Sequence, residues 1–280
     1  DTVLDGGDSE DGSATMPETF AEYARVDVSV NRVTLVDTAG NLYLWGMWDK
    51  SQNTLRESGA EPQKVMEDIR MVRSNRGYIA AIRTDGTLYF QEWDTLQPDA
   101  DPEGAFHLKN LVDLDVGSQN NSVLYAAVQS DGSLWMWGGN RSGEICGVSD
   151  EFLTEPVKVM EDVAQVRCGA QHVMVLKTDG TLWAWGRNAL GQLGTGNTED
   201  AVEPVMVMED VAYIDCTSEY SAAVKTDGTL WMWGRNRAWT YDEYEGNDSY
   251  TGVDTTPAPE LIAEDVAKVS CGESDASILK

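Results

Sequence analysis

The chain has 280 residues, and its 48 Asp and Glu against 20 Lys and Arg give a formal net charge of −28. So acidic a chain repels phosphate backbones and anionic lipids, which argues against binding to nucleic acid or to a membrane surface. No apolar run approaches the roughly 18–20 residues that a membrane helix needs, so no membrane insertion is expected.

A short pattern containing a tight turn recurs along the chain at intervals of 46 to 48 residues. In chain order, its turn glycines are Gly40, Gly86, Gly132, Gly180 and Gly228. Most copies contain Asp-Gly between two runs of alternating apolar residues, which is a strong hairpin signal because glycine accepts the positive φ of a tight turn. A fixed period of this length predicts a repeat architecture.

Two further strands complete each repeat. One precedes the hairpin, as in residues 163–169, and the other follows a proline, as in residues 156–160. Four short antiparallel strands in about 40–50 residues are typical of one propeller blade. The sequence therefore predicts an all-β fold in which residues 1–280 form a single β-propeller domain of four-stranded antiparallel blades.

The blade number is inferred from the first and last repeats. Residues 259–263, 266–272 and 276–280 supply three strands of a last repeat, which lacks its fourth. The acidic segment 1–14 contains Thr2-Val3-Leu4, in register with residues 181–183 of a complete repeat. Because an open ring would leave two blade faces exposed, we expect this N-terminal strand to close a ring of six blades. The alternatives are a seven-bladed ring, and a linker tail in place of the closing strand.

The repeat resembles that of the regulator of chromosome condensation family, in motifs that extend over nearly the whole chain. The best copy contains Gly169-Ala170-Gln171-His172, Asp179-Gly180, Trp183-Ala184-Trp185-Gly186-Arg187-Asn188 and Gly191-Gln192-Leu193-Gly194. Only one repeat keeps the His, and only one keeps Gly-Gln-Leu-Gly intact, with a partial copy at residues 143–147. The resemblance implies a propeller that presents binding loops on its faces, and it implies a structural role for His172.

No catalytic residue, cofactor site or metal site is predicted. The chain has only His107 and His172 and no Cys-x-x-Cys pair, and no nucleophile motif or phosphate loop is present. Acidic pairs such as Glu161-Asp162 recur in turns, but without the spacing of a calcium loop, so they are interpreted as solvated turns. The Trp pairs of the repeats are expected to pack between blades rather than to bind sugars.

Three of the four cysteines occupy one repeat position at the end of the strand before the hairpin. They are Cys168, Cys216 and Cys271, and the fourth is Cys146. Equivalent positions on neighbouring blades are usually too far apart for a disulfide, which needs Cα atoms within about 7 Å. We therefore expect all four to be free, buried thiols.

The longest irregular connection, residues 235–257, carries the candidate binding residues. Its aromatic side chains alternate with carboxylates, and another connection carries Trp48. Rigid aromatic side chains with charged neighbours are typical anchors of protein interfaces. The predicted partner-binding residues are Trp239, Tyr241, Tyr244, Tyr250 and Trp48. The alternative is a loop that folds onto its own propeller.

The sequence therefore predicts a non-enzymatic protein–protein interaction module that is monomeric, needs no cofactor and is secreted or displayed on a bacterial cell surface. One alternative is a glycan-binding protein or hydrolase with an acidic site at the mouth of the central channel. The other is a structural module of a larger surface protein. The identity of the protein partner does not follow from the sequence.

Overall fold

The computed structural model describes residues 23–29, 32–45, 48–49, 54–55, 62–74, 78–92, 108–119, 122–236, 254–272 and 276–280. All regular structure in this described part is β-strand. No helix capable of crossing a lipid bilayer is found there. The all-β class predicted from the alternating apolar runs is confirmed.

The strands form a row of antiparallel sheets in which strand order follows chain order. The first sheet has β1 (Tyr23–Ser29), β2 (Arg32–Asp37), β3 (Leu42–Trp45) and β6 (Gln63–Met66), and the second has β7 (Ile69–Ser74), β8 (Tyr78–Arg83) and β9 (Leu88–Glu92). The third has β10 (Leu111–Gln119), β11 (Ser122–Gln129), β12 (Leu134–Gly139) and β13 (Phe152–Met160). The fourth has β14 (Val163–Cys168), β15 (His172–Lys177), β16 (Leu182–Gly186) and β17 (Ala201–Met208).

The fifth sheet has β18 (Val211–Cys216), β19 (Tyr220–Lys225), β20 (Leu230–Asn236) and β21 (Asp254–Ala263). A last pair joins β22 (Lys268–Cys271) to β23 (Ala276–Leu279), and a small hairpin joins β4 (Trp48–Asp49) to β5 (Thr54–Leu55). The predicted four-stranded antiparallel blades are thus confirmed. Six blades, seven blades and closure by Thr2-Val3-Leu4 stay predictions, because residues 1–22 lie outside the described part.

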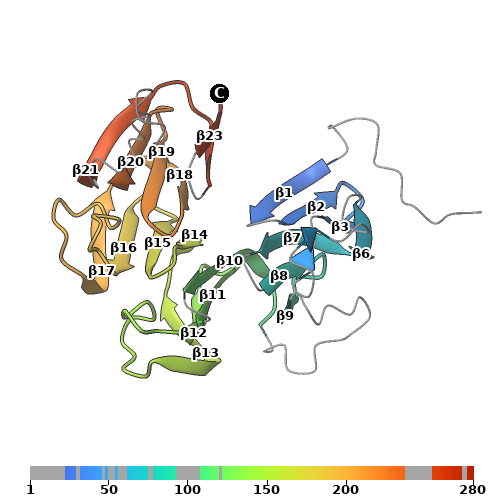
Figure 1. Ribbon diagram of the computed structural model, residues 1–280. Helices are drawn as coiled ribbons and strands as arrows, with labels where there is room; N and C mark the ends of the chain where they lie inside the picture. Colours follow the sequence, from blue (N-terminus) through green and yellow to red (C-terminus); the bar gives the residue numbers. More distant parts are fainter. Residues whose placement is uncertain are drawn as a thin grey trace, which may run out of the picture.

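The sheets succeed one another around a common centre, from the blue β1 to the red β23 (Figure 1). The first strands of neighbouring sheets contact each other, as β10 does with β14 and β14 does with β18, so these strands are the innermost. The fourth strand of a complete sheet is its outer edge, and there the chain has Pro156, Pro204, Pro257 and Pro259. Proline has no N–H to offer to another strand, which suits it to an exposed edge.

Apolar side chains fill the space between neighbouring sheets. The second Trp of each pair, at positions 137, 185 and 233, is at most 3% exposed, whereas the first is half-buried. Trp185 packs against the third sheet and donates from Nε1 to the Glu144 carbonyl over 2.7 Å, and Trp233 donates in the same way to the Gln192 carbonyl over 2.9 Å. The predicted packing of these residues between blades is confirmed.

The recurring turns also join one sheet to the next. Gly132, Gly180 and Gly228 have φ near +83°, and their carbonyls accept hydrogen bonds of 2.9 Å from Val163, Val211 and Val266, the residues that lead into the next sheets. The acidic-pair turns lie beside them: the Asp162 carbonyl accepts from Thr178 N over 2.8 Å, while the Glu161 and Asp162 side chains face solvent. The interpretation of these pairs as solvated turns agrees with this exposure.

Candidate protein-interaction face

The two ends of the sheets carry different connections. The Asp-Gly turns lie at one end, which we call the turn face. The opposite end, which we call the loop face, carries the links from first to second strand and from third to fourth strand, such as residues 169–171 and 187–200. Since loops on a rigid scaffold commonly carry binding residues, the loop face is the candidate interaction surface.

The described residues that flank the predicted aromatic segment lie at the loop face. Asn236 at the end of β20 pairs with Asp254 at the start of β21, so the connection between them begins and ends at this face. The β4–β5 hairpin follows the third strand of the first sheet and thus belongs to the same kind of connection. The side chains of Trp239, Tyr241, Tyr244 and Tyr250 lie outside the described part, as does that of Trp48, so their role in binding stays a prediction.

Buried asparagines hold the described loops of this face in shape. Asn188 is fully buried, its Oδ1 accepts from Leu193 N over 2.9 Å, and its Nδ2 donates to the Asn197 carbonyl over 3.0 Å. In the preceding repeat, Asn140 Oδ1 accepts the equivalent hydrogen bond from Ile145 N over 2.7 Å. The imperfect copy at residues 143–147 therefore forms the same kind of loop as the intact Gly-Gln-Leu-Gly, although its sequence differs.

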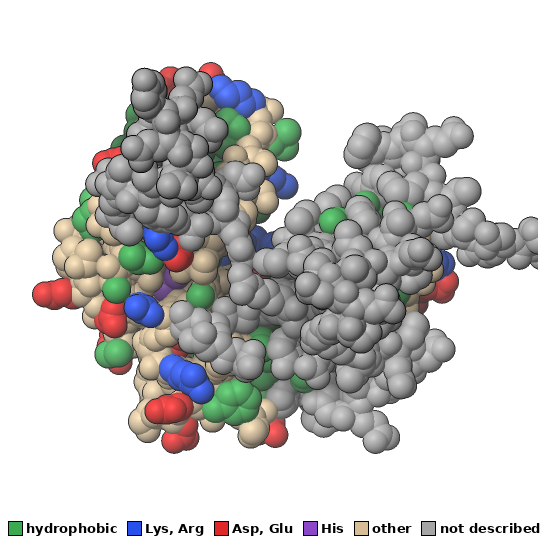
Figure 2. All heavy atoms as spheres, in the orientation of Figure 1, with side chains coloured by type: hydrophobic (Ala, Val, Ile, Leu, Met, Phe, Trp, Pro, Cys, Tyr) green, Lys and Arg blue, Asp and Glu red, His purple; other side chains and the backbone are tan. Residues whose placement is uncertain are grey.

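Polar contacts fix the loops of this face within one sheet and, through Gln171 and Ser142, between neighbouring sheets. Arg187 donates from Nη1 to Gln171 Oε1 over 2.5 Å, and Gln171 donates from Nε2 to Ser142 Oγ over 2.9 Å. Arg235 makes the equivalent contact, an ion pair of 2.7 Å with Glu219. Figure 2 shows positive and negative side chains interspersed over the described part of the surface in view. These contacts fix the described loops of this face relative to the sheets.

His172 is a structural residue, as the family resemblance implies. It is fully buried, and Ser221 Oγ lies 3.0 Å from its Nε2. Because Ser221 donates its only proton to the Gln192 carbonyl over 2.8 Å, it accepts from Nε2–H of a neutral ring. Burial lowers the pKa of His172 to about 4, which agrees with a neutral ring. The second histidine considered, His107, lies outside the described part.

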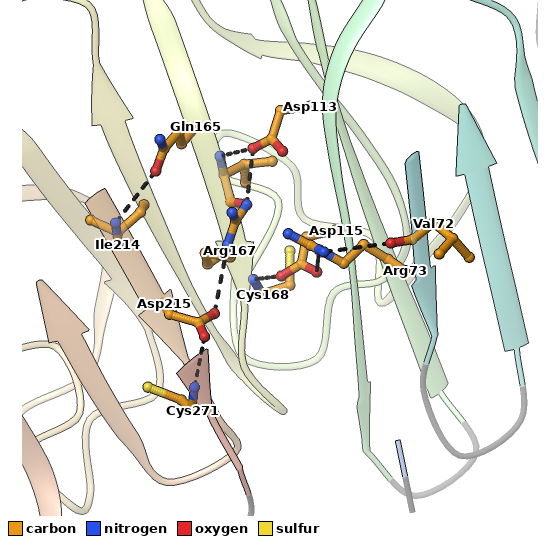
Figure 3. A network of polar contacts seen from close by, with 11 residues as sticks. Val72, Arg73, Asp113, Asp115, Gln165, Arg167, Cys168, Ile214, Asp215 and Cys271 are labelled. Atoms are coloured by element: carbon orange, nitrogen blue, oxygen red, sulfur yellow. Dashed lines mark hydrogen bonds and ion pairs between the residues drawn. The ribbon is translucent and has the colours of Figure 1, made fainter. Parts of the chain in front are cut away.

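A network of charges along the innermost strands was not foreseen from the sequence (Figure 3). Arg167 on β14 pairs through Nη1 with Asp113 Oδ2 on β10 at 3.0 Å, and through Nε with Asp215 Oδ1 on β18 at 3.6 Å. Arg73 on β7 pairs through Nε with Asp115 Oδ1 on β10 at 3.4 Å. These contacts tie four consecutive sheets together near their common centre.

The same carboxylates also satisfy unpaired backbone groups. The inner edge of each sheet has N–H groups with no strand beside them, and neighbouring side chains accept from several of these. Asp113 Oδ2 accepts from Val166 N over 2.9 Å, and Asp115 Oδ2 accepts from Cys168 N over 2.7 Å. Asp215 Oδ2 accepts from Cys271 N over 2.8 Å. The acids near the centre are therefore bound to structural partners.

A register signal could have revealed this network. A charged residue stands four positions after the first residue of the inner strand in four successive sheets. The sign of its charge alternates from sheet to sheet, in the order Arg73, Asp115, Arg167 and Asp215. The apolar and turn positions of the repeat do not reveal this alternation. A row of buried charges is recognisable only once that position is known to lie on touching inner strands.

Burial changes the pKa values of the charged groups in this network. It raises the pKa of Asp115 to about 6, although Arg167, Arg73 and the Cys168 N–H favour the charged form. Burial also raises the pKa of Asp215. For Arg167, burial opposes the charged form, but the attraction of Asp113 and Asp115 overcomes it and raises the pKa.

The cysteines are free, as predicted. Cys168 is buried as predicted. The prediction of full burial is wrong for Cys146, Cys216 and Cys271, whose side chains are half-buried. No group of three or more His, Cys, Asp or Glu side chains in the described part is arranged to hold a metal ion. The absence of cofactor and catalytic residues stays an expectation.

Comparisons with known proteins agree with the repeat pattern. Models of the regulator of chromosome condensation (RCC1) repeat match residues 131–176 and 179–224, and a second model of this repeat matches residues 163–192. Among curated proteins, no sequence relative is detected.

Solved structures share the fold at low sequence identity. Yeast RCC1 (Prp20), solved with Kap60 bound, is 18% identical with a TM-score of 0.74, over 94% of this chain and 69% of that chain. Prp20p from Saccharomyces cerevisiae, described with its binding to Gsp1p and histones, is 17% identical with a TM-score of 0.69, over 91% and 68%. Human WBSCR16 is 16% identical with a TM-score of 0.69, over 92% and 71%. Residues 131–224 therefore match the RCC1 repeat, and the chain has an RCC1-like β-propeller fold.

Proposed function

We propose that this protein is a non-enzymatic interaction module that binds a protein partner through its loop face. The observation that carries the proposal is topological: a long irregular connection, between Asn236 and Asp254, begins and ends on the face whose other loops are internally fixed. Fixed loops lower the entropic cost of binding, because fewer groups must be ordered when the partner arrives. One solved RCC1-like propeller, yeast RCC1 (Prp20), has Kap60 bound, which supports a protein partner here.

The partner that fits this protein has a basic surface. The chain carries a net charge of −28, and the connection between β20 and β21 holds Asp242, Glu243, Glu245 and Asp248 beside its aromatic residues. Opposite charges raise the rate of association, and salt screens that attraction. The affinity for the partner should therefore fall as ionic strength rises. The aromatic residues should supply the contribution to affinity that salt does not screen.

The enzymatic alternative finds little support in the described part of the chain. Asp113, Asp115 and Asp215 are the carboxylates that approach the centre, and each accepts from a backbone N–H and pairs with an arginine. A general acid and base need carboxyl groups that can reach a substrate, whereas these are held by structural partners. Location outside a bacterial cell, a monomeric state and a role within a larger surface protein remain proposals from composition alone.

The test is capture of partners from culture supernatant and host-cell lysate. The parent is compared with a variant that combines Trp239→Ala, Tyr241→Ala and Tyr244→Ala. A matched control combines Glu161→Ala and Glu209→Ala, which are exposed on the turn face. We expect a protein that the parent and the control retain and the aromatic variant loses, with unchanged circular dichroism in all three. Equal retention by the aromatic variant would contradict binding through this connection.

A further inference from the structure

Two loops of the loop face have the same backbone shape. Residues 140–147, which we call the Glu144 loop, follow β12, and residues 188–195, which we call the Gln192 loop, follow β16. Gly143 and Gly191 occupy the same place in the two loops, and both have φ of +75°. In each loop, the residue after this glycine accepts at its carbonyl from a Trp of the following sheet. The two loops therefore correspond position for position.

Glu144 occupies the position of Gln192 and makes the same hydrogen bond. Its Oε2 accepts from Ser142 N over 2.8 Å, as Gln192 Oε1 accepts from Leu190 N over 2.9 Å. Both side chains are buried, at 4% and 2% exposed. The two sites differ in charge, because a side-chain amide is neutral at every pH, whereas a carboxyl group is neutral only when it is protonated.

Glu144 has no cationic partner within the described part of the chain, where its side chain accepts from Ser142 N. Arg141 and Arg187 are both exposed. Arg187 reaches the loop only through Gln171, which donates to Ser142 Oγ. Burying a carboxylate without a cation favours its protonated form. Burial is accordingly the largest influence on the pKa of Glu144 and raises it, although the N–H groups of Ser142 and of Glu144 itself favour the charged form.

The other titratable groups near the Glu144 loop bring no positive charge to it. Burial raises the pKa of Cys168 on β14, and the charge of Glu144 adds to that rise, so this thiol is neutral. Burial, followed by the charge of Glu203 on β17, raises the pKa of Cys146 within the loop. His172 on β15 is neutral and bonds to Ser221 of the fifth sheet. The carboxyl group of Glu144 therefore lies among neutral and acidic neighbours.

We propose that the Glu144 loop is an acid-strengthened element of the loop face, which is held closed while Glu144 is protonated and opens locally as Glu144 ionises. Opening brings the carboxylate to water and breaks the hydrogen bond from Ile145 N to Asn140 Oδ1. Because the pKa of Glu144 is raised in the closed loop, its contribution to closure is fully present below the ordinary value of 4.5 and is lost as pH rises through the raised value. This property belongs to the loop itself and is independent of the partner proposed above.

Hydrogen exchange between pH 5 and pH 8 tests this proposal. Results are expressed as protection factors, which remove the intrinsic dependence of exchange on pH. We expect the protection factor of the Ile145 amide to fall by about fivefold or more over this range, while that of the equivalent Leu193 amide changes by less than about twofold. Glu144→Gln should abolish the fall at Ile145. The absence of a fall in the parent, or an equal fall in Glu144→Gln, would overturn the proposal.

The reciprocal variant, Gln192→Glu, should transfer the pH dependence to the other loop. The Leu193 amide should then lose protection as pH rises, while the Ile145 amide behaves as in the parent. Asp115, whose pKa burial raises to about 6, titrates in the same range. Both variants retain Asp115, so an effect of that residue would persist in Glu144→Gln. Circular dichroism reports whether each variant is folded, and pH-independent protection of Leu193 in folded Gln192→Glu would refute the role of the buried carboxyl group. If Gln192→Glu does not fold, the comparison of the parent with Glu144→Gln decides alone.

Discussion

The inner charge network gives a sharp prediction about which ion pair stabilises the fold. The Arg167 side chain is 5% exposed, and its partner Asp113 is 10% exposed at an Nη1–Oδ2 distance of 3.0 Å. At that distance, and with an effective dielectric constant of about 20, the Coulomb attraction is about 5 kcal/mol before the cost of desolvation. Removing one partner of a buried pair typically costs about 3–5 kcal/mol, because the other charge stays buried without compensation.

We therefore expect Arg167→Met to lower the free energy of unfolding by about 3–5 kcal/mol, since it leaves Asp113 and Asp215 without their shared cation. The matched control is Lys158→Met. The Lys158–Glu161 pair is shorter, at 2.7 Å, but its side chains are 40% and 74% exposed. Solvent screens such a pair, so Lys158→Met should leave stability close to that of the parent.

The assay is urea unfolding followed by tryptophan fluorescence and by circular dichroism, with both probes required to give the same midpoint. A third variant, Arg167→Met/Asp113→Asn, removes one of the uncompensated charges and should recover part of the loss. If Arg167→Met were no more destabilising than Lys158→Met, the network would be incidental to stability.

Three further predictions concern packing, acidity and thiol reactivity. Gly194→Ala places a Cβ 2.7 Å from Trp233 Nε1, whereas Gly196→Ala, also at positive φ, meets nothing within 4 Å. The first should therefore be less stable in urea by about 1–3 kcal/mol, and equal losses would contradict the clash. Because the pKa of Asp115 is raised from 3.8 to about 6, its contribution to stability is present below about pH 4 and lost as pH rises through 6. The stability advantage of the parent over Asp115→Asn, measured in urea, should therefore shrink between pH 4 and pH 7, and a constant difference would contradict the raised pKa. Burial raises the pKa values of Cys168, Cys216 and Cys271, so iodoacetamide at pH 7.5 should label them slowly until the protein unfolds, as mass spectrometry can show. Rapid labelling of the folded protein would refute this.

The hairpins were predictable because their signals are local. Asp179 and Gly180 specify a turn whose geometry depends on few residues, and the apolar runs on both sides of it indicate the two strands that it joins. The loops of the candidate interaction face were predictable only in part. The resemblance located the Gly-Gln-Leu-Gly loop, but it did not show that Asn140 holds the altered copy in the same shape.

The sequence pattern predicted the repeat, the order of strands within each sheet and the packing of the Trp pairs between blades, because period and alternation follow from backbone geometry. The contacts between neighbouring sheets follow only from the tertiary structure. Asp113 and Arg167 are 54 residues apart in the chain, and Trp185 and Glu144 are 41 apart, so no local pattern links them. They meet because the sheets share a centre, where inner strands lie close enough for side chains of one sheet to satisfy the edge of the next.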